Sequence, residues 1–400
     1  MTKPFPDIDF DQYHRQQLPV LLAQGRAELA ARAALKLRPF AFRVGGKSYT
    51  YRIEAGAVVL EPGESNASTI IGLSPQHWQD LVHDLESAPG LLYNQLLEST
   101  EGDSFQLMQW EPALRAMYRG IPPYDKSMAN LCDRRGSALT PDQAYGLDDS
   151  DEALVDFLEA AGYLLVKSVF SAKEIEIFRQ QSELLRRDAV EGDNISWWGQ
   201  NAAGEKVVTR VLKASKQPAF AALYQDERVA RLGQLPPYDL SAWGSDRVDG
   251  VTVVYKNPAM TEGLSDLPWH RDCGMGGHAI TCPQTVLSIY LYDATPAQGP
   301  LLFLPGSHRA CVGFFDPADP DAPEGVTVAA QAGDVTLHYS DVMHAAPAPA
   351  GSEGPFRQSV LLNFAPQYEQ HRGGRHYNDV LLENTQDGQV EHLGQKEKRK

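Results

Sequence analysis

The sequence predicts a mainly β protein with α-helices, in which an α+β N-terminal domain precedes a C-terminal β-sandwich or barrel. Its length of 400 residues exceeds that of one ordinary domain. Before residue 133, segments with helical periodicity alternate with segments whose apolar residues alternate as in strands. After residue 206, short apolar segments follow one another between Gly- and Pro-rich turns, which is typical of sandwiches and barrels.

The N-terminal domain is expected to span residues 1–132. A helix is predicted over residues 7–37, because apolar residues recur every three or four positions. Strands are predicted in "FAFRVGG", "KSYTYRIEAGAVVLEPG" and "STIIGL", and Ser74-Pro75 is a helix start with its N-cap and first-turn proline. A further strand is predicted in "EGDSFQLMQW", residues 101–110, followed by a helix in "EPALRAMYRG".

A polar linker, residues 133–150, is predicted from its Gly and Pro residues. The second domain is expected at residues 151–370, beginning with a helix, a short strand and a helix whose start, Ser171 and Glu174, fits a capping box. Its strands are expected in "KVVTRVL", "GVTVVYK", "QTVLSIYLYDA", "PLLFLPG", "GVTVAAQAGDVTLHY" and "QSVLLNFAP". Residues 371–400 are expected to be a partly disordered extension with a charged end.

Composition excludes several classes of protein. The net charge of −16 argues against nucleic acid and against an anionic membrane surface as partners. No apolar run reaches the roughly 18 residues that a membrane span needs, and the N-terminus lacks a signal-peptide pattern. The four cysteines have no regular spacing, which favours free thiols. We therefore expect a cytoplasmic protein without integral membrane contact; its oligomeric state is not predicted.

The segment "LPWHRDCGMGGH" carries a candidate metal site. His270 and Asp272 are two residues apart, so in a strand their side chains project from the same face. Two ligands hold a metal weakly, and His344 in "GDVTLHYSDVMHAAPAP" is the candidate for the third. Two histidines and one carboxylate are the facial triad of non-haem Fe(II) oxygenases. Zinc could use the same ligands, although a catalytic zinc normally holds a water in a four-coordinate site.

A cosubstrate site is predicted beside the metal site. Arg357 begins a predicted strand, and its planar guanidinium can pair bidentately with the distal carboxylate of a dicarboxylic keto acid. Thr252 and Ser288, on neighbouring predicted strands, could offer hydroxyls to the same cosubstrate or could only pack. His338 and Lys256 are interpreted as core or pocket-lining residues.

Four segments in this order, "WHRD", "YDATPAQGPLLFLPGSH", "GDVTLHYSDVMHAAP" and Arg357, resemble the phytanoyl-CoA dioxygenase family. The resemblance implies a double-stranded β-helix, the cupin-like jelly roll, which uses Fe(II), 2-oxoglutarate and O2. It implies that His270, Asp272 and His344 are the catalytic iron ligands and that Arg357 grips the cosubstrate. It also implies hydroxylation with succinate and CO2 as co-products.

The sequence departs from that family's pattern at three positions. Arg271 stands where the family often has Gln, Ala346 where it often has a small hydroxyl, and Ser288 where it often has an aromatic residue. The metal-binding carboxylate is retained, whereas related halogenases lack it, so the resemblance favours hydroxylation. These departures leave the substrate, including any role of CoA, open.

The N-terminal domain is similar to sterol-carrier-protein-2-like domains over "KSYTYRIEAGAVVLEPG", "ASTIIGLSPQHWQDLVHDL" and "EGDSFQLMQW". Those domains enclose an apolar tunnel for lipids, so the similarity implies a small-molecule substrate that is bulky and apolar, such as a lipid, terpenoid, sterol or acyl thioester. Two alternatives stay open. The protein could bind or transfer lipids with a non-catalytic barrel, or the same oxygenase could perform desaturation, epimerisation or ring formation.

Overall fold

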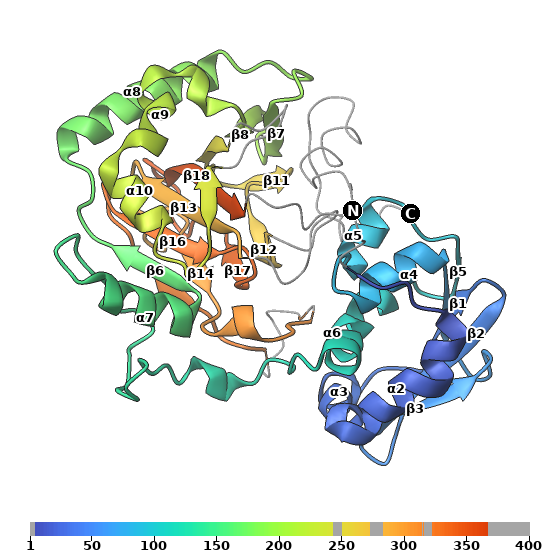
Figure 1. The fold of residues 1–400 in the computed structure, drawn as a ribbon. Helices are drawn as coiled ribbons and strands as arrows, with labels where there is room; N and C mark the ends of the chain where they lie inside the picture. The colour runs from blue at the N-terminus through green and yellow to red at the C-terminus, as the bar shows by residue number, and fades with distance from the viewer. Residues whose placement is uncertain (1–4, 243–249, 273–282, 314, 316–321, 367–400) are drawn as a thin grey trace.

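The computed structural model describes residues 5–242, 250–272, 283–313, 315 and 322–366. Two separate hydrophobic cores organise these residues. One core is built from buried residues between Phe10 and Tyr118, and the other from buried residues between Leu131 and Phe364. We call residues 5–120 the N-terminal lobe and residues 151–366 the C-terminal lobe (Figure 1). The predicted domain boundaries at 132 and 150 stay predictions, because two cores do not fix where a boundary falls.

The N-terminal lobe is α+β. Its helical start runs through α1 (Phe10–Gln12), η1 (Tyr13–Gln17), α2 (Leu18–Leu21), η2 (Leu22–Arg26) and α3 (Ala27–Ala34). The helical path is broken at Gly25, whose φ of 91° suits glycine. A five-stranded sheet follows in the order β3-β2-β1-β4-β5, with bounds β1 Phe40–Val44, β2 Lys47–Glu54, β3 Ala57–Pro62, β4 Thr69–Leu73 and β5 Ser99–Glu101.

The strand predicted over residues 101–110 is wrong. Strand β5 ends at Glu101, and residues from Phe105 onward form helix α6 (Phe105–Arg119). The apolar residues that looked like an alternating strand continue at helical spacing, because Leu107, Trp110 and Leu114 are all buried on one side of the helix. Gly120, with a φ of 72°, ends α6 in the left-handed conformation.

The remaining helices of this lobe are α4 (Pro75–Val82) and α5 (Ala88–Tyr93). The predicted start of α4 is confirmed, because the Ser74 side chain accepts a hydrogen bond from the His77 N–H and Pro75 occupies the first turn. Segment 121–150 connects the lobes and contains the short helix η3 (Lys126–Ala129). Its later part packs on the C-terminal core, since Tyr145 is buried and bridges to Val166.

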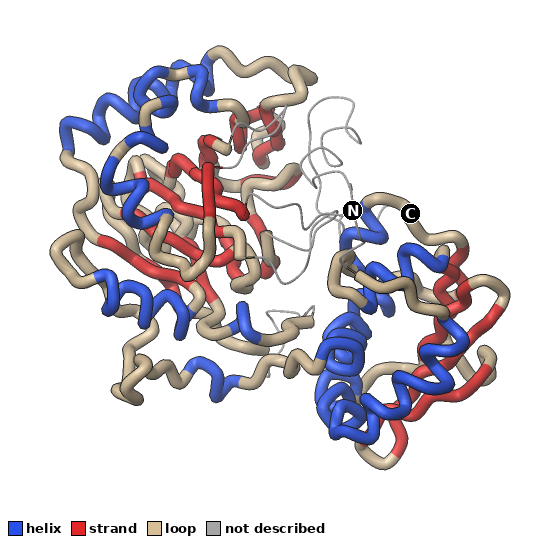
Figure 2. Tube along the Cα trace, viewed as in Figure 1, coloured by secondary structure: helices blue, strands red, loops and turns tan. Residues whose placement is uncertain are grey.

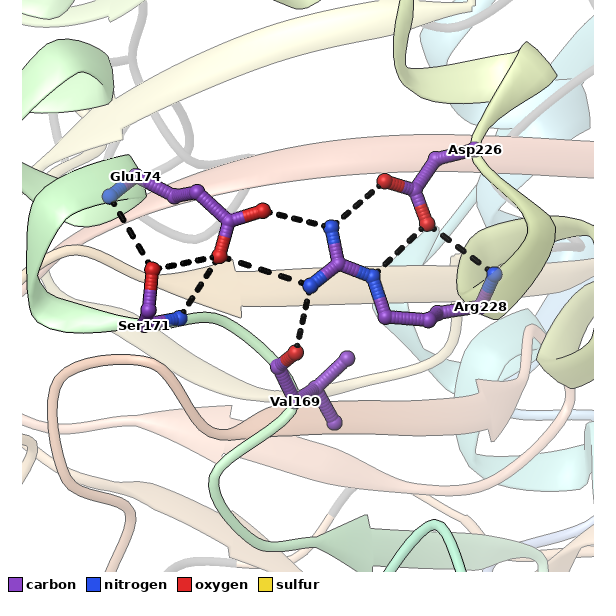
Figure 3. Close-up of polar contacts among 5 residues, drawn as sticks. All are labelled: Val169, Ser171, Glu174, Asp226 and Arg228. Atoms are coloured by element: carbon purple, nitrogen blue, oxygen red, sulfur yellow. Dashed lines mark hydrogen bonds and ion pairs between the residues drawn. The ribbon is translucent and has the colours of Figure 1, made fainter.

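The C-terminal lobe begins with α7 (Asp151–Ala161), β6 (Tyr163–Val166) and α8 (Ala172–Arg187), as predicted. The capping box at the start of α8 is confirmed: Ser171 and Glu174 exchange side-chain and backbone hydrogen bonds. Glu174 also pairs with Arg228, which in turn pairs with Asp226 and donates to the Val169 carbonyl (Figure 3). This network joins the start of α8 to α10 (Glu227–Gly233), and the Arg228 guanidinium and the Ser171 hydroxyl lower the pKa of Glu174 to about 2.

Two sheets form the body of the C-terminal lobe. The larger has nine strands in the order β11-β7-β8-β10-β18-β13-β16-β6, with β9 pairing β18, and the smaller has the order β12-β17-β14-β15. The larger sheet contains β6 and β7 Ser196–Asn201, β8 Lys206–Val211, β9 Leu240–Ala242, β10 Val251–Tyr255, β11 Met260–Glu262, β13 Thr285–Tyr290, β16 Val335–Tyr339 and β18 Gln358–Pro366. The smaller contains β12 Leu267–His270, β14 Leu301–Phe303, β15 Val326–Val328 and β17 His344–Ala346.

Helices cover the side of these sheets that lies away from the N-terminal lobe (Figure 2). Besides α7 and α8 they are η4 (Ala214–Lys216), α9 (Pro218–Ala221), η5 (Leu223–Gln225) and α10 (Glu227–Gly233), with η6 (Ser307–Arg309) after β14. The mixed β and α architecture is therefore confirmed. Among the described residues, no helix has the length and apolar character that crossing a membrane requires.

Candidate active site

Backbone pairing brings the two candidate histidine ligands together. His270 is the last residue of β12 and His344 the first of β17, and these antiparallel strands place the two residues opposite each other. Their ring centroids are 4.2 Å apart. The strand pairing thus delivers two imidazoles from distant parts of the sequence to one edge of the smaller sheet.

The carboxylate of Asp272 completes a cluster of three metal-binding side chains. Its Oδ1 lies 3.7 Å from Nε2 of His270 and 3.8 Å from Nε2 of His344. One ligand atom from each residue can be chosen so that all lie within 4.8 Å of one another. Two imidazole nitrogens and one carboxylate oxygen are the donor set that suits a non-haem Fe(II) site. The residues present therefore fit this metal.

Each of the two imidazoles is held by its other nitrogen. Nδ1 of His270 lies 2.7 Å from the Pro268 carbonyl oxygen, and Nδ1 of His344 lies 3.0 Å from the Val342 carbonyl oxygen. A carbonyl only accepts, so each Nδ1 carries the hydrogen and donates it. Each Nε2 then keeps its lone pair toward Asp272, which is the orientation that a metal ligand requires.

The protonation states of the cluster also suit a metal. Burial lowers the pKa of His344 to about 3 and lowers that of His270 as well. Burial alone would raise the pKa of Asp272, but His344, His338 and His270 together hold it well below its usual range. At neutral pH the imidazoles are therefore neutral and the carboxylate is ionised, so no proton has to leave before a metal binds.

The cluster lies at a pocket that encloses about 620 Å³, part of it open to solvent. All three candidate ligands line it, and so do Arg357 and Ser288. The pocket's apolar wall includes Val254, Leu264, Leu267, Val286, Leu301 and Leu361. Its other cationic side chains are Arg210 and Lys256. The pocket therefore combines a metal-binding group, a largely apolar wall and several cations.

Among the pocket's polar groups without a hydrogen-bond partner in the described part of the chain, two belong to predicted cosubstrate residues. They are Nε of Arg357, which immediately precedes β18, and the hydroxyl of Ser288 on β13. Both side chains are buried, and burial lowers the pKa of Arg357. Buried polar groups are normally hydrogen-bonded, so these two are suited to receive an acceptor from a bound molecule. Two of the three predicted cosubstrate residues, Arg357 and Ser288, thus line the same pocket as the metal cluster.

Thr252 is placed differently. Thr252 on β10 and Ser288 on β13 both pair with Leu361 of β18, which lies between those strands. The three side chains therefore share one face of the sheet. Thr252 is buried but does not belong to the residues that line the described pocket. Its predicted contact with the cosubstrate stays a prediction.

Sequence reasoning missed the role of His338, which it interpreted only as core or pocket lining. On β16, this side chain reaches Asp272, with Nε2 lying 3.3 Å from Oδ2. Asp272 therefore has one oxygen toward the two candidate histidine ligands and the other toward a third histidine. The available signal was a histidine in the fully buried strand "VTLHY".

Lys256 was considered for the pocket, and the structure shows how it is held there. Its ammonium donates to the carbonyl oxygens of Ser265 and Ala346, at 2.7 and 2.6 Å, and pairs with Asp266. Burial, with a smaller contribution from Arg357, lowers its pKa to about 8. Arg210 was not predicted for the pocket; its guanidinium carbon lies 4.3 Å from the centre of the Trp197 ring.

The cysteines, the segment "GMGGH" and His308 are not part of the described metal cluster. Cys273 and Cys282 lie outside the described residues, as do the glycines and histidine of "GMGGH". The other two cysteines, Cys132 and Cys311, are free thiols, in agreement with the prediction for them. His308 hydrogen-bonds the Glu159 carbonyl oxygen and is not part of the three-residue cluster.

Part of this chain is similar to curated proteins. An ectoine dioxygenase of Stutzerimonas stutzeri is 31% identical over 170 residues, which cover 40% of this chain and 52% of that protein. One from Bordetella parapertussis is 27% identical over 215 residues, which cover 48% and 64%. The chain thus spans between half and two thirds of the length of these curated relatives.

Two solved structures show weaker likeness. AviO1 from Streptomyces viridochromogenes shares 24% identity with a TM-score of 0.43, covering 55% of this chain and 96% of that one. EctD from S. alaskensis, with 2-oxoglutarate and 5-hydroxyectoine, shares 21% identity with a TM-score of 0.44, covering 59% and 83%. The model of the family described as phytanoyl-CoA dioxygenase (PhyH) matches residues 158–357, half of the chain. The matched segment contains the whole candidate metal cluster together with Arg357, and the chain belongs to the phytanoyl-CoA dioxygenase family.

Proposed function

We propose that this protein is an Fe(II)- and 2-oxoglutarate-dependent dioxygenase that hydroxylates a small molecule, with succinate and CO2 as co-products. One observation carries the proposal. Ligand atoms of His270, Asp272 and His344 converge within 4.8 Å in the pocket that also contains the unpartnered Nε of Arg357. A metal cluster beside a buried, unsatisfied guanidinium suits a cosubstrate that chelates a metal at one end and carries a carboxylate at the other.

In this proposal the three clustered side chains hold iron. Bound iron supplies open coordination positions for the keto acid and dioxygen and the electrons for dioxygen activation. The carbonyls of Pro268 and Val342 keep both imidazoles turned toward it. Holding the ligands rigidly through such outer contacts raises their basicity and fixes their geometry.

Arg357 is proposed to bind the distal carboxylate of 2-oxoglutarate, with the Ser288 hydroxyl as a second donor. Both groups are buried and lack partners within the described chain, so a carboxylate would satisfy them. Thr252 is proposed only as an additional contact, because it shares the face of Ser288 without lining the pocket.

We also propose that the two sheets of the C-terminal lobe form a double-stranded β-helix spanning residues 151–370. The ends of the smaller sheet's β12 and β17 provide the histidines, while Arg357 precedes a strand of the larger sheet. In this proposal the cosubstrate would bind between the two sheets. A sterol-carrier-like domain at residues 1–132 and a linker at 133–150 remain proposals, supported by the separate N-terminal core.

An apolar substrate remains our proposal, and polar compounds are added to the candidate substrates. The pocket's wall is largely apolar, but Arg210 and Lys256 add charge beside it. The curated relatives are named as ectoine dioxygenases, and we infer that the substrate panel has to include polar cyclic compounds as well as sterols, terpenoids and acyl thioesters. A cytoplasmic location stays a prediction.

Succinate release tests this function. Purified protein is supplied with Fe(II), 2-oxoglutarate and air, and each compound of the panel is added in turn. We expect at least one compound to raise succinate release above the background without substrate, and H344A to abolish the increase because the third ligand is lost. If the protein released no succinate with any compound of the panel and none without substrate, the proposal would be contradicted.

A further inference from the structure

Helix α6 of the N-terminal lobe lies on the side that faces the C-terminal lobe (Figure 1). Three of its residues, Glu111, Pro112 and Arg115, approach that lobe. Pro112 packs against Gly313, where an added Cβ would lie 3.1 Å from the proline Cγ. Glu111 and Arg115 are four residues apart and so lie on the same side of the helix. This face of α6 is therefore the part of the N-terminal lobe from which a side chain could act on the metal cluster.

Glu111 forms an ion pair with Arg271 of the C-terminal lobe. Nη2 of Arg271 lies 3.8 Å from Oε2 of Glu111, and each side chain is only 9% exposed. The other oxygen of Glu111 accepts a hydrogen bond of 2.9 Å from the Ala88 N–H at the start of α5. Glu111 is thus anchored within its own lobe while it presents a charge to Arg271.

Arg271 stands between the two candidate metal ligands His270 and Asp272. Successive side chains of an extended chain project to opposite faces, so Arg271 is directed away from the ligands on either side of it. It reaches the other lobe from the back of the metal-binding segment. Any shift of Arg271 would therefore be transmitted through one peptide bond to each of these two ligands.

A second buried ion pair lies beside the first. Arg115 donates two hydrogen bonds to Asp84, at 2.9 and 3.1 Å, and both side chains are almost fully buried. Burial lowers the pKa of Arg115, but the carboxylates of Asp84 and Asp341 raise it above its ordinary value. Asp341 lies three residues before His344. The charges on this face of α6 therefore lie near both segments that supply the metal cluster.

Backbone hydrogen bonds join the segment that leaves α6 to the C-terminal lobe. The Cys311 N–H donates to the Pro122 carbonyl oxygen at 2.8 Å, and the Tyr124 N–H donates to the Cys311 carbonyl oxygen at 2.9 Å. Burial raises the pKa of the Cys311 thiol to about 11, while Arg115 and Arg271 oppose that rise. The thiol is thus protonated at neutral pH and adds no charge to the two ion pairs. The chain that leaves α6 is consequently paired to the C-terminal lobe next to them.

We propose that Glu111 is a positioning residue of the metal site, through which the N-terminal lobe holds Arg271 and thereby orients His270 and Asp272. This inference rests on the proposed function, because it assumes that the cluster binds a divalent metal. Removing one partner of a buried ion pair leaves the other charge uncompensated, so Arg271 must move toward water when Glu111 loses its charge. The predicted consequence is weaker metal binding caused by a substitution in the other lobe.

The test measures Mn(II) affinity of the full-length protein by the electron paramagnetic resonance signal of free Mn(II). The variants are E111Q, R271Q and the double variant. Gln at position 111 keeps an oxygen for the Ala88 N–H but removes the charge, and Gln at 271 removes the cation. The control is E28Q, because the Glu28 side chain lies in the first turn of α3 and is exposed to solvent.

We expect each single variant to weaken Mn(II) binding by about tenfold, the lower end of the effect of residues that orient metal ligands. The double variant should be no weaker than either single one, since both remove the same contact. E28Q should bind as the wild type does. Thermal unfolding of each variant shows whether the N-terminal lobe is still folded, and R271Q tests the contact from the other lobe if E111Q does not fold.

Three results would overturn the inference. Affinity within twofold of wild type in both single variants would mean that the contact does not act on the site. A lowered unfolding temperature with unchanged Mn(II) affinity would assign the ion pair a purely structural role, and additive effects in the double variant would show that the residues act separately. Failure of the proposed function is distinct from these, because then the wild type itself would bind no Mn(II).

Discussion

Nε2 of His338 lies 3.3 Å from Oδ2 of Asp272, while Oδ1 of the same carboxylate faces Nε2 of both His270 and His344. The two oxygens of Asp272 therefore have different surroundings. A donor on Oδ2 leaves Oδ1 as the oxygen that is free to bind a metal together with the two imidazoles.

His338 is expected to set the orientation of Asp272. Replacing it with Ala removes the contact on Oδ2, and we expect Mn(II) or Co(II) affinity to fall by about 10- to 100-fold. Replacing it with Gln, which can still donate from its amide, should restore part of the loss. Equal affinities for wild type, H338A and H338Q would show that His338 only fills space.

Arg357 is expected to control affinity for 2-oxoglutarate. R357A should raise the KM for 2-oxoglutarate by about 10- to 100-fold, since a hydrogen-bonded pair with a charged group contributes roughly 1.5–3 kcal/mol. R357K should recover only part of this, because an ammonium lacks the planar fork. Initial rates of succinate formation across 2-oxoglutarate concentrations measure the effect, and a KM unaffected by R357A would remove Arg357 from the cosubstrate site.

Ser288 is expected to contribute more than Thr252 to the binding of 2-oxoglutarate. Ser288 lines the pocket and its hydroxyl lacks a partner within the described chain, whereas Thr252 does not line it. S288A should therefore raise the KM for 2-oxoglutarate several-fold, by about 1 kcal/mol for one neutral hydrogen bond, and T252A should raise it less. If T252A raised the KM for 2-oxoglutarate more than S288A does, the cosubstrate would lie closer to Thr252 than to Ser288.

The stability of the N-terminal lobe should decrease in acid because of His14. Burial lowers the pKa of His14 to about 4 from its ordinary 6.5. As the pH falls from 6.5 to 4, the unfolded chain gains this proton and the folded chain does not. The free energy of unfolding should therefore fall by up to about 1.4 kcal/mol per pH unit from this group.

Urea denaturation of wild type and of H14Q between pH 4 and 7 isolates this contribution. The wild type should lose stability relative to H14Q as the pH falls, because Gln cannot take up the proton. A difference between the two proteins that is constant over this range would mean that His14 titrates normally in the folded state.

Local signals in the sequence predicted much of the fold. Ser74-Pro75 and the pair Ser171 and Glu174 predicted helix starts correctly, because an N-cap interacts only with residues a few positions away. Residues 101–110 were misassigned as a strand because a short apolar window fits both periods, and only the longer helical repeat through Leu114 distinguishes them.

The sequence predicts those parts of the candidate site that depend on the spacing of nearby residues. It does not predict the parts that depend on pairing between distant segments. The two-residue spacing of His270 and Asp272 indicated a metal site, but the position of His344 opposite His270 depends on the register of β12 and β17. The contacts of His338 with Asp272 and of Arg271 with Glu111 also join distant segments. No local pattern encodes such contacts.

We infer that His270, Asp272 and His344 together bind Fe(II) in a form that accepts 2-oxoglutarate. The most direct measurement is the visible absorption spectrum of the protein mixed with Fe(II) and 2-oxoglutarate in the absence of air. We predict a weak charge-transfer band that needs both additions and disappears in H270A, which a zinc site would not give. A wild-type protein that shows no such band with both present would contradict the claim.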